Sequence, residues 1–214
     1  MASPSSDRQT DHRKAAARRR FDRWAGSYER DRRSRFNAKP QAAAVASLAL
    51  RPGDRFLDVG CGTGAAVRAA APIVERAVGA DISPEMVRRA KDLVGGLANV
   101  EFVVADSEAL PFPSGVFSAV LCTASFHHYP NPRNALSEMA RVLETAGRLV
   151  IADGVGDRLA ARIADRILRW VDRSHIRLYR TDELTTMLGG AGFSDIVVST
   201  LYDGGYAIIQ SRRV

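Results

Sequence analysis

The sequence predicts an α/β fold, a doubly wound and mostly parallel sheet of seven strands that ends in an antiparallel hairpin. From residue 52 onward, short apolar runs alternate with segments of helical periodicity, the order that builds a parallel sheet with helices on both faces. Near the C-terminus this alternation stops, and two strand-like runs follow each other across Asp203-Gly204-Gly205. Such a turn is typical of a hairpin, so we expect one edge of the sheet to be antiparallel.

The first half of the sheet is predicted from residues 55–106. Strands are expected at 55–60, 76–83 and 99–106, and helices at 63–74 and 83–96. Ser83 can cap the second helix, Pro84 suits its first position, and Gly95 suits its end.

The second half continues the same pattern. Strands are expected at 117–125 and 147–153, with a helix over 131–147 between them, a later helix over 181–193 and the hairpin over 194–213. Asn131 or Asn134 can cap the first of these helices, and Thr181 the second. The parallel crossovers should be right-handed.

Residues 157–173 predict an amphipathic helix. Five arginines form one stripe, Arg158, Arg162, Arg166, Arg169 and Arg173, and an apolar stripe of Leu159, Ile163, Ile167 and Trp170 lies beside it. We expect this helix to be buried on one side and wet on the other. The alternative is a lid over a substrate pocket, facing anionic or lipid-borne substrates.

The positive charge is concentrated at the N-terminus. Residues 1–39 hold 12 of the 31 Lys and Arg and 5 of the 24 Asp and Glu, so the other 175 residues hold 19 of each sign. A nucleic-acid-binding face within the fold would normally add basic clusters to the body as well. We therefore expect residues 1–20 to be a basic, flexible arm and residues 21–214 to be one domain, with residues 21–50 as an N-terminal helical cap.

Composition also bounds the class of protein. No run of about 18 apolar residues could form a membrane span, and the first twenty residues lack the apolar centre of a secretory signal. Cys61 and Cys122 are the two cysteines, and neither belongs to a CxxC pair. A cytoplasmic location and no structural metal are therefore expected.

The stretch "RFLDVGCGTGAAV" at 55–67 marks the candidate binding site, since ligands of such sheets lie beyond the carboxyl ends of the strands. Gly60-x-Gly62-x-x-Ala65 also fits the dinucleotide fingerprint, with Asp81 21 residues after Gly60. Asp58 argues against a diphosphate, because a carboxylate roughly 5–6 Å away would oppose it by about 3 kcal/mol. A cationic amino-acid tail reverses that sign, which favours S-adenosylmethionine over NAD.

Four segments together resemble the class I S-adenosylmethionine-dependent methyltransferases. "FLDVGCGTGA" looks like their first motif, "VGADIS" their acidic second-strand motif, and "FVVADSEALPF" their third. "ASFHHYPNPRNALSEMARVLETAGRLVIAD" is similar to the branch that contains ubiquinone/menaquinone-biosynthesis C-methyltransferases and many small-molecule methyltransferases. The resemblance covers about residues 20–155 and implies a Rossmann-like sheet. It departs at residues 144–147, "ETAG", where the family commonly has Lys-Pro-Gly-Gly and where only Gly147 remains to take a left-handed conformation.

The resemblance implies roles for individual residues around the cofactor. Asp58 should approach the methionine ammonium, Asp81 the ribose hydroxyls, and Asp106 the adenine amino group. The other expected contacts are the backbone of Gly60, Gly62 and Gly64, the Ile82 side chain on the adenine face, the Ser107 amide, Thr123 and Tyr28.

Methyl transfer from a sulfonium is an in-line displacement, so the protein mainly aligns the reactants, excludes water and sometimes supplies a base. His127 and His128 follow the fourth strand, and either is a candidate catalytic base or a structural residue. We expect a small organic methyl acceptor, no nucleic acid and at most weak membrane contact; the acceptor atom and oligomeric state stay open. The alternatives are an RNA methyltransferase that uses the basic arm, an NAD-dependent oxidoreductase, or a cofactor-binding regulator without chemistry.

Overall fold

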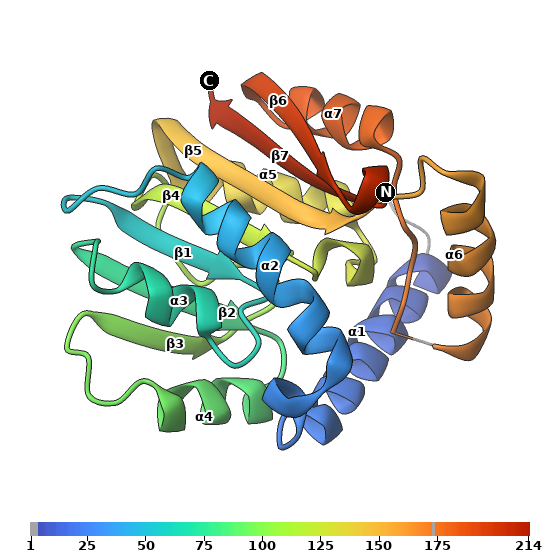
Figure 1. Cartoon of the computed structure of the whole chain (residues 1–214), viewed down its shortest axis with the longest axis horizontal. Coiled ribbons are helices and arrows are strands. Elements are labelled where there is room, and N and C mark those ends of the chain that lie inside the picture. The colour runs from blue at the N-terminus through green and yellow to red at the C-terminus, as the bar shows by residue number, and fades with distance from the viewer. Residues whose placement is uncertain (1–3, 173) are drawn as a thin grey trace.

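The strands of the sheet lie side by side in the order β3-β2-β1-β4-β5-β7-β6 in a computed structural model that describes residues 4–172 and 174–214 (Figure 1). Neighbouring strands from β1 to β5 pair in parallel, whereas β7 is antiparallel to both β5 and β6. The predicted fold class is therefore confirmed, including its C-terminal antiparallel hairpin. The strands are β1 (Arg55–Val59), β2 (Arg76–Asp81), β3 (Val100–Val104), β4 (Phe117–Thr123), β5 (Leu143–Gly154), β6 (Phe193–Leu201) and β7 (Tyr206–Arg213).

Helices cover both faces of this sheet, and each face has its own apolar core. Core residues of one face include Ala44, Val67 and Ala90, which come from three successive helices; on the other face Leu136 and Leu188 come from two more. In Figure 1, α2 and α3 lie in front of the sheet and α5 behind it. The first three helices are α2 (Arg32–Ser47), α3 (Ala65–Ala70) and α4 (Pro84–Leu93), and the other two are α5 (Pro132–Val142) and α7 (Thr181–Gly190).

Two further helices, α1 (Pro4–Trp24) and α6 (Leu159–Val171), stand at the end of the molecule where strands β1 to β5 terminate (Figure 1). The boundary expected at residue 20 falls inside α1, which continues without interruption to Trp24. Ala17 is almost fully buried, so the basic segment packs against the domain along one side. Residues 1–3 of the expected arm, and Arg173 of the expected arginine stripe, lie outside the described residues.

Two helix caps and one turn can be compared with the residues that the sequence predicted for them. Ser83 caps α4 as expected, its Oγ accepting the Met86 N–H at 3.1 Å. Arg180, rather than Thr181, occupies the N-cap position of α7. The left-handed residue of the "ETAG" turn is Ala146, with φ 60°, and not Gly147. The described residues also form three short 3₁₀ helices, η1 (Tyr28–Arg30), η2 (Phe126–His128) and η3 (Tyr202–Gly204).

Among the described residues, we find no helix with both the length and the apolar character needed to cross a bilayer.

Candidate cofactor site and the adjoining histidine cavity

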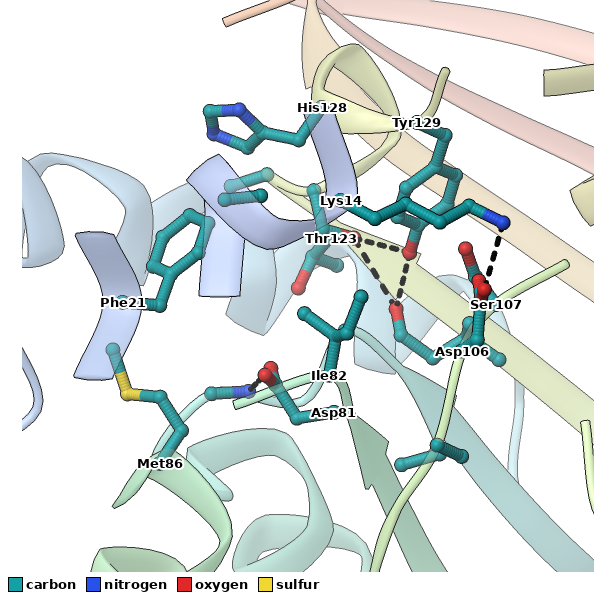
Figure 2. Close-up of a pocket in the computed structure, with 18 of the residues that line it drawn as sticks. Lys14, Phe21, Asp81, Ile82, Met86, Asp106, Ser107, Thr123, His128 and Tyr129 are labelled. Carbon is teal, nitrogen blue, oxygen red and sulfur yellow. Dashed lines mark hydrogen bonds and ion pairs between the residues drawn. The ribbon is translucent and has the colours of Figure 1, made fainter. Parts of the chain in front are cut away.

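A cavity opens at the carboxyl ends of β1, β2 and β4, and we call it the glycine-loop cavity (Figure 2). It lies where the chain leaves β1 and the strand order reverses, the usual ligand site of a doubly wound sheet. Nine of the twelve residues predicted for the site line it. They are Tyr28, Gly60, Gly62, Asp81, Ile82, Asp106, Ser107, Thr123 and His128. The structure places Asp58, Gly64 and His127 outside its lining.

The glycine loop after β1 allows the backbone to form the cavity floor. Gly60 has φ 78°, and a Cβ there would lie 2.4 Å from Ser125 Oγ. Ser125 Oγ is itself held by the Val59 carbonyl oxygen at 3.2 Å, so it could not retreat without breaking that bond. Gly64 packs against the Phe102 ring at the start of α3, which makes its role one of helix packing.

Asp81 ends β2 and ties the glycine loop to the start of α4. Its two oxygens accept the N–H groups of Gly62 at 2.9 Å and Ser83 at 2.8 Å. A carboxylate has about four lone-pair sites, so two remain that could accept ligand hydroxyl groups. Burial, with a smaller contribution from nearby Asp22, raises the pKa of Asp81 to about 6, although the two N–H bonds favour its charged form.

Asp58 is fully buried in β1, and neither of its oxygens has a hydrogen-bond partner among the described residues. Burial, helped by the nearby Asp81 carboxylate, raises the pKa of Asp58 to about 8. The side chain does not line the glycine-loop cavity. Asp58 is therefore mostly protonated at neutral pH without ligand, and it repels a diphosphate less than the sequence argument assumed.

Helix α1 forms the outer wall of the glycine-loop cavity. Lys14 reaches Asp106 and Glu108 at 2.7 Å each, and Asp22 accepts the Ser83 hydroxyl at 2.6 Å. Phe21 extends from the same helix toward the cavity, opposite Ile82 (Figure 2). Asp106 was expected to be free for an adenine, and the structure instead pairs it with Lys14 because α1 covers this edge.

The residues of the glycine-loop cavity fit S-adenosylmethionine better than a dinucleotide. Lys14 is the one Lys or Arg among the described lining residues, and two carboxylates already neutralise it. A diphosphate would lack a free cation there. The unpartnered Asp58 carboxyl, in contrast, would be stabilised in its charged form by a nearby ammonium.

A second cavity adjoins the first, and we call it the histidine cavity because His127, His128 and His175 line it. Its other walls are mainly rings and arginines, namely Phe21, Trp24, Tyr28, Phe36, Arg20 and Arg32. Phe21, Tyr28, Ala124 and His128 line both cavities, so the two spaces share a wall.

Each histidine is held by a fixed partner. His127 Nδ1 lies 2.7 Å from Asp153 Oδ1, and Asp153 Oδ2 accepts the backbone N–H of His127 at 3.1 Å. His128 Nδ1 donates to the Ser174 carbonyl oxygen at 2.6 Å, and burial together with the neighbouring His127 lowers its pKa well below the usual range. Its ring is therefore neutral at pH 7.

Sequence reasoning missed Lys14, Asp153 and His175 as site residues. Asp153 is the next-to-last residue of β5, as Asp58 is of β1, so its place near the end of the strand run "RLVIAD" was the signal that could have indicated it. His175 and Lys14 lie in segments without a strand-end motif, and only the packing of α6 and α1 brings them to the cavities.

Cys122 lies inside β4 and is fully buried. Burial raises the pKa of its thiol to about 12, so the thiolate that a nucleophilic role requires is not populated at neutral pH.

Comparison with known proteins identifies the family. The family described as "Methyltransferase domain" matches residues 57–151. The chain is 29% identical over 221 residues to the demethylmenaquinone methyltransferase of Tropheryma whipplei, covering 93% of this chain and 92% of that protein. It is 33% identical over 137 residues to YcgJ of Bacillus subtilis, named an uncharacterized methyltransferase, covering 62% of this chain and 54% of that one. The chain thus spans about half the length of that relative.

Solved structures share the fold. Haemonchus contortus phosphoethanolamine N-methyltransferase 2, in complex with S-adenosyl-L-methionine, superposes with a TM-score of 0.75 at 18% identity, covering 90% of this chain and 57% of that one. The chain therefore belongs to the class I S-adenosylmethionine-dependent methyltransferases, enzymes whose methyl donor is S-adenosylmethionine.

Proposed function

We propose that this enzyme transfers a methyl group from S-adenosylmethionine in the glycine-loop cavity to a small organic molecule in the histidine cavity. The observation that carries the proposal is the wall common to both cavities, formed by Phe21, Tyr28, Ala124 and His128. Because the two cavities share these lining residues, a methyl donor in one and an acceptor in the other can be aligned for in-line transfer, away from bulk water. When bound, the cofactor supplies an electrophilic methyl group on a sulfonium.

The cofactor roles follow from the lining of the glycine-loop cavity. Asp81 accepts the ribose hydroxyls on its two remaining lone-pair sites, and the glycine loop lies along the amino-acid tail. Ile82 packs on the adenine, while Asp106 and Ser107 lie at its polar edge. Thr123 and Tyr28 contact the methionine side, and Asp58 acts on the ammonium through its field, directly or through water.

His127 is the residue we propose as the base. Asp153 holds the proton on Nδ1, which leaves the lone pair of Nε2 available to a proton on the acceptor. His128 stays neutral, and its Nδ1–H donates to the Ser174 carbonyl oxygen. Its Nε2 is therefore a hydrogen-bond acceptor within the wall that the two cavities share. The rings around the cavity favour a planar acceptor, which agrees with the demethylmenaquinone methyltransferase relative.

A thermal shift experiment tests the cofactor assignment. S-adenosylhomocysteine at about a hundred times its dissociation constant should stabilise the protein by roughly 2.7 kcal/mol. NAD at the same concentration should leave the melting temperature unchanged. Stabilisation by NAD alone would contradict the proposal. A panel of phenols, hydroquinones and amines, with S-adenosylhomocysteine formation as the readout, then identifies the acceptor class.

The pKa of Asp58 predicts proton release on cofactor binding. An ammonium nearby lowers that pKa from about 8, so the carboxyl loses its proton when the ligand binds at pH 7. Affinity for S-adenosylhomocysteine should therefore rise by about tenfold from pH 7 to pH 8.5, saturating once unliganded Asp58 is ionised. Isothermal titration calorimetry in two buffers of different ionisation enthalpy measures the released proton.

Adenosine is the matched control, because it carries the ribose and adenine but no ammonium. Its affinity should stay constant over this range, since Asp81, with its pKa near 6, is already ionised. Asp58→Asn should remove the proton release for S-adenosylhomocysteine. An equal pH dependence for both ligands would show that Asp58 does not sense the amino-acid tail.

A further inference from the structure

Helix α6 is attached to the domain mainly by polar contacts. Asp165 is its one buried residue in the described structure, with 5% of its surface exposed. The carboxylate of Asp165 accepts His175 Nε2 at 2.7 Å and the Leu178 N–H at 2.7 Å, and Arg169 approaches it at 3.2 Å. An amphipathic helix normally faces the core with its apolar side, whereas α6 faces the domain with the side that carries Asp165.

The apolar side of α6 points into solvent. Leu159, Ile163, Ile167, Trp170 and Val171 recur at the spacing of one helical face, and we call them the α6 stripe. Each is more than half exposed, from 56% at Ile163 to 88% at Trp170. Asp165 is two residues from both Ile163 and Ile167, about 200° around the helix, so the stripe faces away from the domain. The expectation that this side is buried is wrong.

Positive charge borders the α6 stripe. Arg158, Arg162 and Arg166 are exposed along one flank, and no ion pair holds them within the part of the chain described. On the domain side, two shallow hollows between α6 and α1 contain Arg13, Arg19, Arg23 and Arg169. Figure 1 shows α1 and α6 together at one end of the molecule.

We propose that the α6 stripe and the arginines around it dock the protein on an anionic lipid bilayer. A helix that lies in the interface inserts its apolar face among the acyl chains while flanking arginines contact phosphate groups. A second copy of the chain fits less well, because a symmetric contact through the stripe would bring two rows of unpaired arginines together. A nucleic acid would leave the apolar residues unused.

This docking is independent of the proposed methyl acceptor, although it bears on how an acceptor arrives. Leu168 of α6 and His175, which bonds Asp165 of the same helix, line the histidine cavity, so a docked molecule would hold that cavity close to the bilayer surface.

Vesicle flotation tests the proposal. The protein should float with vesicles of equimolar phosphatidylglycerol and phosphatidylcholine and stay behind with phosphatidylcholine alone. Ile163→Asp with Ile167→Asp should lower the bound fraction by about tenfold or more, because two inserted side chains are lost. Arg158→Gln, Arg162→Gln and Arg166→Gln together should also lower it and weaken its salt dependence. Val197→Asp, another residue more than half exposed but on β6, is the matched control and should float as the wild type does.

Tryptophan emission gives a readout inside the stripe. The chain has two tryptophans, and emission should shift to shorter wavelength with the anionic vesicles but not in Trp170→Phe. Retained stabilisation by S-adenosylhomocysteine shows that each variant is folded. The proposal is overturned if the wild type does not float, or if it floats equally with neutral vesicles. It also fails if the isoleucine variants only dissociate a dimer on a sizing column, or only lose RNA binding.

Discussion

Replacing Asp81 by alanine is expected to abolish stabilisation of the protein by S-adenosylhomocysteine. The carboxylate would accept two ribose hydroxyls, and hydrogen bonds to a charged group contribute about 1.5–3 kcal/mol each. The substitution also leaves the N–H groups of Gly62 and Ser83 without acceptors, which loosens the glycine loop. Affinity should fall by roughly 10²- to 10⁴-fold, as measured by calorimetry.

Asp92→Ala is the control for that substitution. Asp92 does not line the glycine-loop cavity and pairs with Arg88 on the exposed surface of α4. Its loss therefore removes one negative charge without changing the cofactor site. Cofactor affinity should be unchanged in this variant. If Asp81→Ala binds S-adenosylhomocysteine as the wild type does, the glycine-loop cavity is not where the ribose lies.

Replacing His127 by alanine should lower kcat by about 10²- to 10⁴-fold with the acceptor found by screening, the range that a positioned base contributes. The rise in melting temperature that S-adenosylhomocysteine causes should be unchanged, because His127 does not line the glycine-loop cavity. Initial rates, with S-adenosylhomocysteine formation as the signal, provide kcat, and the thermal shift with S-adenosylhomocysteine provides the cofactor control.

Asp153→Asn separates a base from a structural histidine. The amide can still accept the His127 backbone N–H, but it no longer favours the Nδ1 proton as a carboxylate does. A base would lose much of its activity in this variant. Full activity in both variants would assign His127 to helix entry alone, leaving only alignment to drive the transfer.

The fold was largely predictable because its signals are local. The alternation of apolar runs with helical patterns predicted β1 to β5, and Asp203-Gly204-Gly205 predicted the β6–β7 hairpin. The helix expected over 63–74 is shorter, Ala65–Ala70, since alanine-rich periodicity does not fix where a helix ends. Residues 1–20 were expected to be a flexible arm because their positive charge is visible in the local sequence, whereas the pairing of Lys14 with Asp106 and Glu108 depends on residues distant in the chain.

The site residues that lie at the end of a strand, or directly after it, were predictable from the sequence. Gly60, Asp81 and Thr123 reach the glycine-loop cavity because parallel strands terminate at one edge. The outward apolar face of α6 could not be predicted, since periodicity shows that a helix has two faces but not which face meets the domain. Likewise the sequence shows Asp58 as an acid without showing its burial, and its protonation depends on that burial.

The isolated carboxyl of Asp58 has a consequence for how long the protein lasts without its cofactor. Its pKa is about 4 in an unfolded chain and about 8 in the fold, so the unfolded form releases its proton first as pH rises. The free energy of unfolding therefore declines as pH rises from about 4 to about 8, and at neutral pH the enzyme without ligand has lost much of this contribution to its stability. Ligand binding offsets this loss. Cellular levels of this enzyme should then follow the supply of its cofactor, because proteases remove chains that open more often.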